Sequence, residues 1–247
     1  MINKTLSEIG YDAKKMPLGK LSENTLKAGY EVLKEMEKEI KKKAPNSATL
    51  NNLSSRFYTL IPHDFGFSNM ANFVIRDLDK VKEKVEMISN LSDMKIAQTM
   101  ISETDDSDAN VLDEHYKKLN CKLTPLQKTG KEYKLVEQYC ANTGSGWWGG
   151  SGLKPLDIYE IDRKGEEARF NKKMGNNVLL WHGSGVPNFV GILSQGLRIA
   201  PPEAPVSGYR FDKGVYFADM LRLSAGYCRN SPGSVGCLLL CEVACGK

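Results

Sequence analysis

A histidine, a glycine and a serine stand together at the end of an apolar run, Val178–Ser184 (VLLWHGS). The run has the composition of a buried strand, and the turn after a strand often carries binding and catalytic groups. The imidazole of His182 can exchange a proton near neutral pH, Gly183 permits close backbone approach, and Ser184 adds a hydroxyl. We therefore expect a functional site at this strand end.

The same residues do not predict a serine hydrolase. His182 and Ser184 are only two positions apart, and the Gly-x-Ser-x-Gly turn of that fold is absent. Three tyrosines, Tyr209, Tyr216 and Tyr227, flank a glycine-containing turn further along. Their rings suit either stacking on a flat ligand or packing in a core, and the pattern leaves both alternatives open.

The segment Gly144–Gly149 matches Gly-x-Gly-x-x-Gly, the pattern of dinucleotide-binding turns. That pattern is informative only between a strand and a helix. Here a helical segment, 133–140, precedes it, and a loop containing Pro155 follows. We therefore expect a flexible loop, with Trp147 and Trp148 packing it onto the body of the protein.

A metal site is not expected. The chain has six cysteines and three histidines, with no Cys-x-x-Cys pair. Cys237, Cys241 and Cys245 recur every fourth residue in an apolar stretch, whereas zinc sites need closer Cys and His spacing. We expect reduced thiols that pack or lie at the surface. His63 is expected in a capped turn after a proline, and His115 at the surface.

The elements that position these residues divide the chain into two halves. Apolar residues recur in steps of three and four through 26–40, 50–61 and 78–101, which predicts a bundle of amphipathic helices. A short helix is expected over 113–119. The second half holds most of the glycines and short apolar runs typical of strands, at 156–161, 178–181, 214–217 and 237–243. Short helices are expected at 186–195 and 220–228.

Composition limits the class of protein. The 247 residues are 41% hydrophobic and 26% charged, which is ordinary for a folded protein. No run approaches the ~18 apolar residues of a membrane span, and the N-terminus has no apolar signal region. The formal charge of +4 is too small to require a nucleic-acid partner.

Several segments together resemble the catalytic domain of poly(ADP-ribose) polymerases, namely Leu179–Ser184, Asn188–Pro205 and Lys213–Asp219. The first half independently resembles the helical regulatory domain that precedes it in the DNA-damage-dependent branch, through Lys15–Ser22, Arg56–Gly66 and Lys82–Met87. The resemblance implies a regulatory α-helical domain over 1–120, its first helix missing. It implies the N-terminal part of an α+β, split β-sheet ADP-ribosyltransferase domain over 121–247, truncated at its C-terminus.

The resemblance also implies an NAD+ site without a metal. His182 and Tyr216 match the first two residues of the family's His-Tyr-Glu catalytic signature, with His182 bonding the adenosine ribose. Gly183 matches the residue whose backbone pairs with the nicotinamide amide. Ser224 matches the donor to that amide, and Tyr227 matches the ring that stacks on nicotinamide.

Four further positions match the rest of the site. Ser184, Gly191 and Arg198 match residues on the adenosine side, and Tyr209 matches a tyrosine near the nicotinamide ribose. The implied reaction transfers ADP-ribose to acceptor proteins, the enzyme itself included. Contact with damaged DNA is implied only through domains outside this sequence, with nuclear localisation, a role in DNA repair and no membrane partner.

Two departures from the family pattern qualify that expectation. The signature glutamate lies beyond the segment matched by Glu242–Ala244, so the 247 residues do not include it. We therefore expect a fragment of the catalytic region, and the alternatives are an inactive protein that binds partners or a mono-ADP-ribosyltransferase. In addition, Ser89 replaces an acidic residue on the face of the helical domain that meets NAD+.

Overall fold

The computed structural model describes every residue except 1, 103–109, 145–152, 207–211 and 229–233. The Gly144–Gly149 motif therefore lies mostly outside the described residues, as do Trp147 and Trp148. The chain forms two compact units. Unit 1 comprises Met1–Asp105 and Leu197–Val215, and unit 2 comprises Asp106–Gly196 and Tyr216–Lys247.

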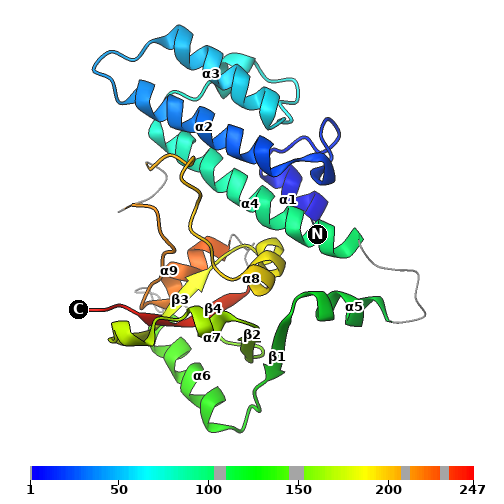
Figure 1. Cartoon of the computed structure of the whole chain (residues 1–247), viewed down its shortest axis with the longest axis vertical. Coiled ribbons are helices and arrows are strands. Elements are labelled where there is room, and N and C mark those ends of the chain that lie inside the picture. Colours follow the sequence, from blue (N-terminus) through cyan, green and yellow to red (C-terminus); the bar gives the residue numbers. More distant parts are fainter. Residues whose placement is uncertain (1, 103–109, 145–152, 207–211, 229–233) are drawn as a thin grey trace. The chain divides into compact units, whose positions relative to one another are not determined.

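Unit 1 is built from helices (Figure 1). α2 packs against both α3 and α4, and residues from these helices are fully buried. The apolar run predicted over 78–101 forms one continuous helix. The helices of this unit are α1 (Ile2–Glu8), α2 (Glu23–Ile40), α3 (Ser47–Leu60) and α4 (Leu78–Ser102), with the 3-10 turns η1 (Leu18–Lys20) and η2 (Met70–Phe73).

Side-chain caps explain where two of these helices begin. The Ser22 hydroxyl accepts a hydrogen bond from the Thr25 amide at 3.0 Å before α2. The Asn46 side chain accepts one from the Thr49 amide at 3.0 Å before α3. Each cap satisfies an amide that the first helical turn leaves without a backbone partner. Both helices agree with the runs predicted over 26–40 and 50–61.

A segment from the second half of the sequence completes unit 1. In Leu197–Val215, Ala204 is fully buried in the helical core. The Lys34 ammonium donates to the Pro202 carbonyl at 3.1 Å, and the Val206 amide donates to the Glu37 carboxylate at 3.2 Å. This segment is therefore held on α2 by burial and by polar contacts.

Unit 2 contains two small antiparallel sheets, β1–β2 and β3–β4. The helical first half and a second half of helices with short sheets agree with the fold class expected from the sequence. The elements are α5 (Val111–Lys118), β1 (Cys121–Pro125), α6 (Lys131–Gly144), β2 (Tyr159–Arg163), α7 (Glu166–Arg169), η3 (Lys172–Met174), β3 (Asn177–Gly183), η4 (Val186–Asn188), α8 (Phe189–Gln195), α9 (Leu221–Ala225), η5 (Gly226–Cys228) and β4 (Leu238–Ala244).

Two strand predictions need correction, and one strand was missed. The strand expected over 214–217 is not formed, and the next residue, Ala218, makes only an isolated bridge with Trp181. The strand expected over 156–161 begins later, as β2, because its pairing with β1 sets the register. β1 itself was not predicted. Among the described residues, no helix combines the length and apolar character needed to cross a membrane.

Candidate NAD-binding site

The end of β3 is positioned by pairing on both edges. β3 pairs with β4 along its whole length, from Asn177 opposite Ala244 to Gly183 opposite Leu238. On its other edge, the amides of Trp181 and Ala218 donate to each other's carbonyls at 2.7 and 2.9 Å. The buried Trp181 ring stacks on Tyr139 with centroids 5.3 Å apart. These contacts fix the backbone just before His182.

The His182 ring is oriented by a backbone carbonyl. Its Nδ1 lies 2.9 Å from the Tyr216 carbonyl oxygen, and its ring lies 5.8 Å from that of Phe217. A carbonyl can only accept, so Nδ1 carries the hydrogen and Nε2 is the acceptor of the neutral imidazole. Through this contact the structure joins the two residues matched to the catalytic signature.

Gly183 is required by the close approach of another segment. A Cβ at this position would overlap the Ser224 carbonyl oxygen and lie 3.4 Å from the Cys228 sulfur. The buried Ser224 hydroxyl donates to the Trp181 carbonyl at 2.8 Å. Strand β3 and the segment carrying Ser224 therefore meet at van der Waals distance, and the glycine makes that contact possible.

Two tyrosines flank this contact. α9 and η5 both pack against β3, and η5 carries Tyr227. The Tyr227 side chain is 63% exposed and that of Tyr216 is 36% exposed. Exposed tyrosine faces beside ordered polar groups can stack on a flat aromatic ligand. The core-packing alternative is therefore not supported for these two rings, whereas Tyr209 lies outside the described residues.

Ser184 and Gly191 occupy the turn and helix that follow β3. The Asn188 side-chain amide donates to the Ser184 hydroxyl at 3.0 Å, and Asn188 is itself buried. Gly191 is buried within α8. Asn188 was not among the expected site residues, although an asparagine just before an apolar helical run is a common start signal.

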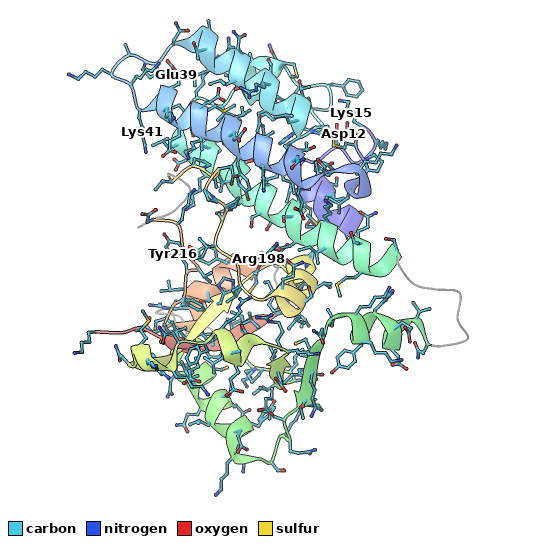
Figure 2. All side chains as sticks on the ribbon, viewed as in Figure 1. Asp12, Lys15, Glu39, Lys41, Arg198 and Tyr216 are labelled. Carbon is cyan, nitrogen blue, oxygen red and sulfur yellow. The ribbon has the colours of Figure 1, made fainter. Side chains whose placement is uncertain are left out.

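Arg198 belongs to unit 1, where it forms an ion pair with Asp93 of α4 (labelled Arg198 in Figure 2). Burial raises the pKa of Asp93, and the Arg198 guanidinium opposes that shift. Asp93 lies four residues after Ser89, hence on the same face of α4. Asp93 was not among the residues expected on that face from the sequence.

No group of three or more metal-ligating side chains occurs among the described residues. The cysteines that the structure describes are all free thiols. Of the nine site residues expected from the sequence, six lie together in unit 2 around β3 and the elements packed on it, as detailed above. Those six are His182, Gly183, Ser184, Tyr216, Ser224 and Tyr227.

Two family models match the chain. The poly(ADP-ribose) polymerase regulatory domain matches residues 1–116, and the poly(ADP-ribose) polymerase catalytic domain matches residues 130–247. The helical half of the chain and the half that contains β3 are thus matched separately, in the order that the family uses.

Curated relatives agree over the whole sequence. The chain is 44% identical over 250 residues to poly [ADP-ribose] polymerase 2-B of Oryza sativa subsp. japonica, which covers 100% of this chain and 41% of that protein. It is 45% identical over 249 residues to poly [ADP-ribose] polymerase 2 of Arabidopsis thaliana, covering 100% and 39%.

An animal relative gives the same result. Poly [ADP-ribose] polymerase 1 of Gallus gallus is 43% identical over 250 residues, with 100% of this chain and 24% of that protein covered. The chain therefore spans less than half the length of these relatives. With both domain models matched in order and identity maintained from end to end, the chain belongs to the poly(ADP-ribose) polymerase family.

Proposed function

We propose that this chain is part of an NAD+-dependent poly(ADP-ribose) polymerase and that unit 2 binds the nicotinamide end of NAD+. The observation that carries the proposal is the contact between Gly183 and the Ser224 segment, beside an oriented His182. It brings a hydroxyl, an imidazole and exposed aromatic rings to one strand end, as recognition of a flat amide-bearing ring requires.

The residues present fit this ligand. We propose that Tyr227 stacks on the nicotinamide ring and that Gly183 pairs with its amide through the backbone. Ser224 would donate to the same amide, which requires its hydroxyl to leave the Trp181 carbonyl that it now contacts at 2.8 Å. This exchange of one hydrogen bond for another makes the net contribution of Ser224 modest.

NAD+ supplies the glycosidic bond between nicotinamide and ribose, whose cleavage develops positive charge on the ribose. In the proposal, His182 and Tyr216 hold the ribose portion, and His182 contributes Nε2 as a hydrogen-bond acceptor. Ser184, Gly191, Arg198 and Tyr209 are proposed on the adenosine and ribose sides. Catalysis then comes from orientation and electrostatic stabilisation.

The family also suggests the acceptors, the localisation and the domain boundary of the protein. We propose that the full protein modifies acceptor proteins, itself included, and that it acts in the nucleus in DNA repair. Contact with damaged DNA is proposed for regions outside these 247 residues. We also propose a domain boundary near residue 120, between the regulatory helices and the catalytic region.

Ligand binding tests the proposal directly. Saturation-transfer NMR would measure nicotinamide and NAD+ binding to the wild-type chain, to Tyr227→Ala and to a control, Tyr159→Ala. Tyr159 lies on β2 of the same unit and is 51% exposed, so the control removes a comparable ring away from β3. Loss of one stacking contact should weaken nicotinamide binding ~3- to 10-fold in Tyr227→Ala only.

Equal affinities for Tyr227→Ala and the wild type would contradict the stacking assignment. Failure of the folded wild-type chain to bind either ligand would contradict the site as a whole. Automodification by the full-length protein, compared with its His182→Ala variant, then tests the transferase reaction.

A further inference from the structure

Two cysteines meet beside Gly183, in a place that the proposed function does not use. The thiol of Cys228, at the end of η5, donates to the Cys237 carbonyl at 3.3 Å. It also lies 4.0 Å from the Ser224 carbonyl and accepts a hydrogen bond from the Ser184 amide. Cys228 is buried, so these contacts hold its sulfur in one place.

Cys237 approaches from the other side of the same contact. It immediately precedes Leu238, the β4 residue that pairs with Gly183. Its side chain is half-buried; burial raises the pKa of the Cys228 thiol, and a negative charge on Cys237 adds to that shift. The carbonyl that the Cys228 thiol contacts belongs to Cys237 itself, so a bond between the two thiols would join residues that are already in contact.

The other cysteines near β4 have different surroundings. Cys241 is half-buried, and burial raises the pKa of its thiol to about 11, with a smaller contribution from the charge on Glu166 of α7. Cys245 is exposed, and its thiol contacts the Val243 carbonyl at 3.7 Å. These contacts favour a bond between Cys228 and Cys237. The sequence alone would instead group Cys237 with Cys241 and Cys245, which follow it at intervals of four residues.

We propose that Cys228 and Cys237 form a reversible disulfide that ties the segment carrying Ser224 and Tyr227 to the start of β4. Glutathione disulfide is the oxidant. The more accessible Cys237 thiolate attacks one glutathione sulfur, giving a mixed disulfide and one glutathione. Cys228 then attacks the Cys237 sulfur, releasing the second glutathione. Two protein thiols are oxidised, one glutathione disulfide is reduced, and both protons end on glutathione.

The bond connects elements that otherwise touch only through non-covalent contacts. α9 and η5 pack on β3, and the disulfide would add a covalent link from η5 to the neighbouring strand. Oxidation should therefore reduce local opening of Leu221–Cys228. Because Ser224 and Tyr227 lie on this segment, redox state would also act on the nicotinamide site, a consequence that rests on the proposed function.

Mass spectrometry tests the pair without reference to NAD+. The reduced chain is equilibrated with increasing ratios of glutathione disulfide to glutathione, the free thiols are alkylated, and the protein is digested with trypsin. Arg229 places Cys228 and Cys237 in different peptides, and tandem spectra separate Cys237 from Cys241 and Cys245. The expected product joins 228 to 237 and is reversed by excess glutathione.

Two variants and one control sharpen the test. Cys237→Ser, at a half-buried position, should leave Cys228 as a free thiol, and Cys228→Ala should leave Cys237 as a glutathione adduct. The control Cys245→Ser should form the 228–237 bond as the wild type does. Oxidation of the wild type should slow amide exchange across Leu221–Cys228, with no slowing in Cys237→Ser.

Free Cys228 in fully oxidising buffer, or linkage of Cys237 to Cys241 or Cys245 at equal yield, would overturn the proposal. Nicotinamide binding is measured separately on the oxidised and reduced chains. A chain that forms the bond but binds no nicotinamide in either state would refute the proposed site and leave the disulfide standing.

Discussion

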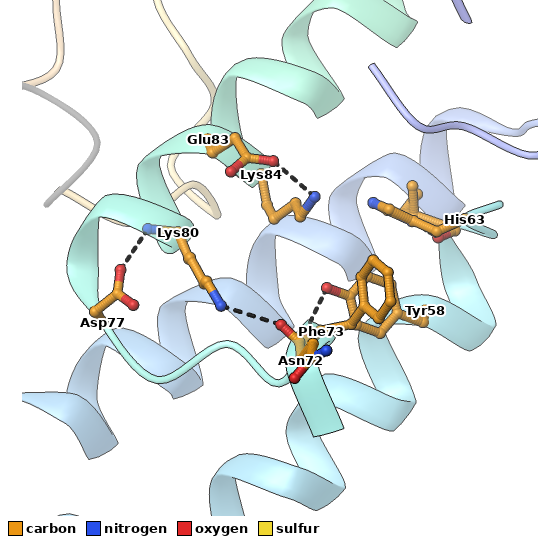
Figure 3. A network of polar contacts seen from close by, with 9 residues as sticks. Tyr58, His63, Asn72, Phe73, Asp77, Lys80, Glu83 and Lys84 are labelled. Atoms are coloured by element: carbon orange, nitrogen blue, oxygen red, sulfur yellow. Dashed lines mark hydrogen bonds and ion pairs between the residues drawn. The ribbon is translucent and has the colours of Figure 1, made fainter. Parts of the chain in front are cut away.

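Acid should destabilise unit 1 through one buried histidine, His63. Figure 3 shows its ring beside Tyr58 and Lys84. The centroids of the His63 and Tyr58 rings are 4.5 Å apart. Nδ1 lies 2.7 Å from the Ile61 carbonyl, whereas Nε2 is buried with no hydrogen-bond partner among the described residues. Burial, with a smaller contribution from the Lys84 charge, lowers the pKa of His63 to about 4, and the hydrogen bond to Ile61 and the Glu83 charge partly oppose this shift.

The sign and size of the effect follow from that pKa. The unfolded chain binds a proton at His63 near pH 6.5, and the folded chain does so only near 4. Unfolding therefore becomes easier as the pH falls from 6.5 toward 4, and His63 adds no pH dependence above that window. Lowering a pKa by ~2.5 changes the free energy of unfolding by ~3.4 kcal/mol once the pH has fallen below both pKa values. By pH ~5, ~2 kcal/mol of this is already lost.

Comparison with His63→Phe isolates this contribution. Phenylalanine keeps an aromatic ring among Phe57, Tyr58 and Phe65 but cannot titrate. Urea unfolding followed by circular dichroism, which is dominated by the helices of unit 1, would give the free energy of unfolding between pH ~7.5 and ~5. The wild type should lose ~2 kcal/mol more than the variant over this range.

The difference between the two proteins is the relevant quantity, because other groups also titrate. The pKa of Asp12 is lowered, mainly by the Lys15 backbone amide, and that of Glu39 is lowered, mainly by Lys42. Both carboxylates are present in both proteins, so their acid effects cancel. A wild-type-minus-variant difference that stays constant with pH would refute the assignment of a neutral, buried His63.

Three other substitutions give separate tests. Ser22→Ala should lower the free energy of unfolding of unit 1 by ~1 kcal/mol by removing the α2 cap, whereas Ser22→Asp should retain most of it, as urea unfolding can measure. Gly183→Ala should lower the free energy of unfolding by ~1–3 kcal/mol and weaken nicotinamide binding, because the new methyl overlaps the Ser224 carbonyl. A Cβ added at Gly226, in the same unit, would meet no other described part of the chain within 4 Å, so Gly226→Ala should leave both quantities unchanged. Asp93→Asn should leave the free energy of unfolding of unit 1 unchanged or raise it by up to ~1 kcal/mol, because burial keeps the pKa of Asp93 raised in spite of Arg198, and a double-mutant cycle with Arg198→Gln should show coupling of at least ~0.5 kcal/mol.

The helices were predictable because their information is local. In α2 the apolar residues recur every three or four positions, and Ser22 marks the start. The same signals locate α3 and α4. The pattern did not reveal that His63 is buried, because the residues packed around it come from α3, from Phe65 and from the bridge to Tyr11.

The strands were less predictable because their partners are distant in sequence. β1 is a five-residue segment that includes two charged or polar side chains and ends in proline, so it has little local signal. Its existence depends on β2, with Cys121 opposite Arg163 at one end of the ladder. The docking of Ala204 into the helical core is another long-range contact that lacks a periodic pattern.

At the candidate site, too, the sequence identified residues but not the groups that surround them. The sequence identified His182 and Gly183, but it assigned the glycine's role to close approach by a ligand. The structure shows that the segment approaching Gly183 is the chain's own Ser224 carbonyl, and that His182 is oriented by the Tyr216 carbonyl. Backbone atoms therefore set much of this geometry. Sequence motifs can locate such a site. Substitution of Gly183 tests the close packing of the two backbone segments more directly than removal of any one polar side chain.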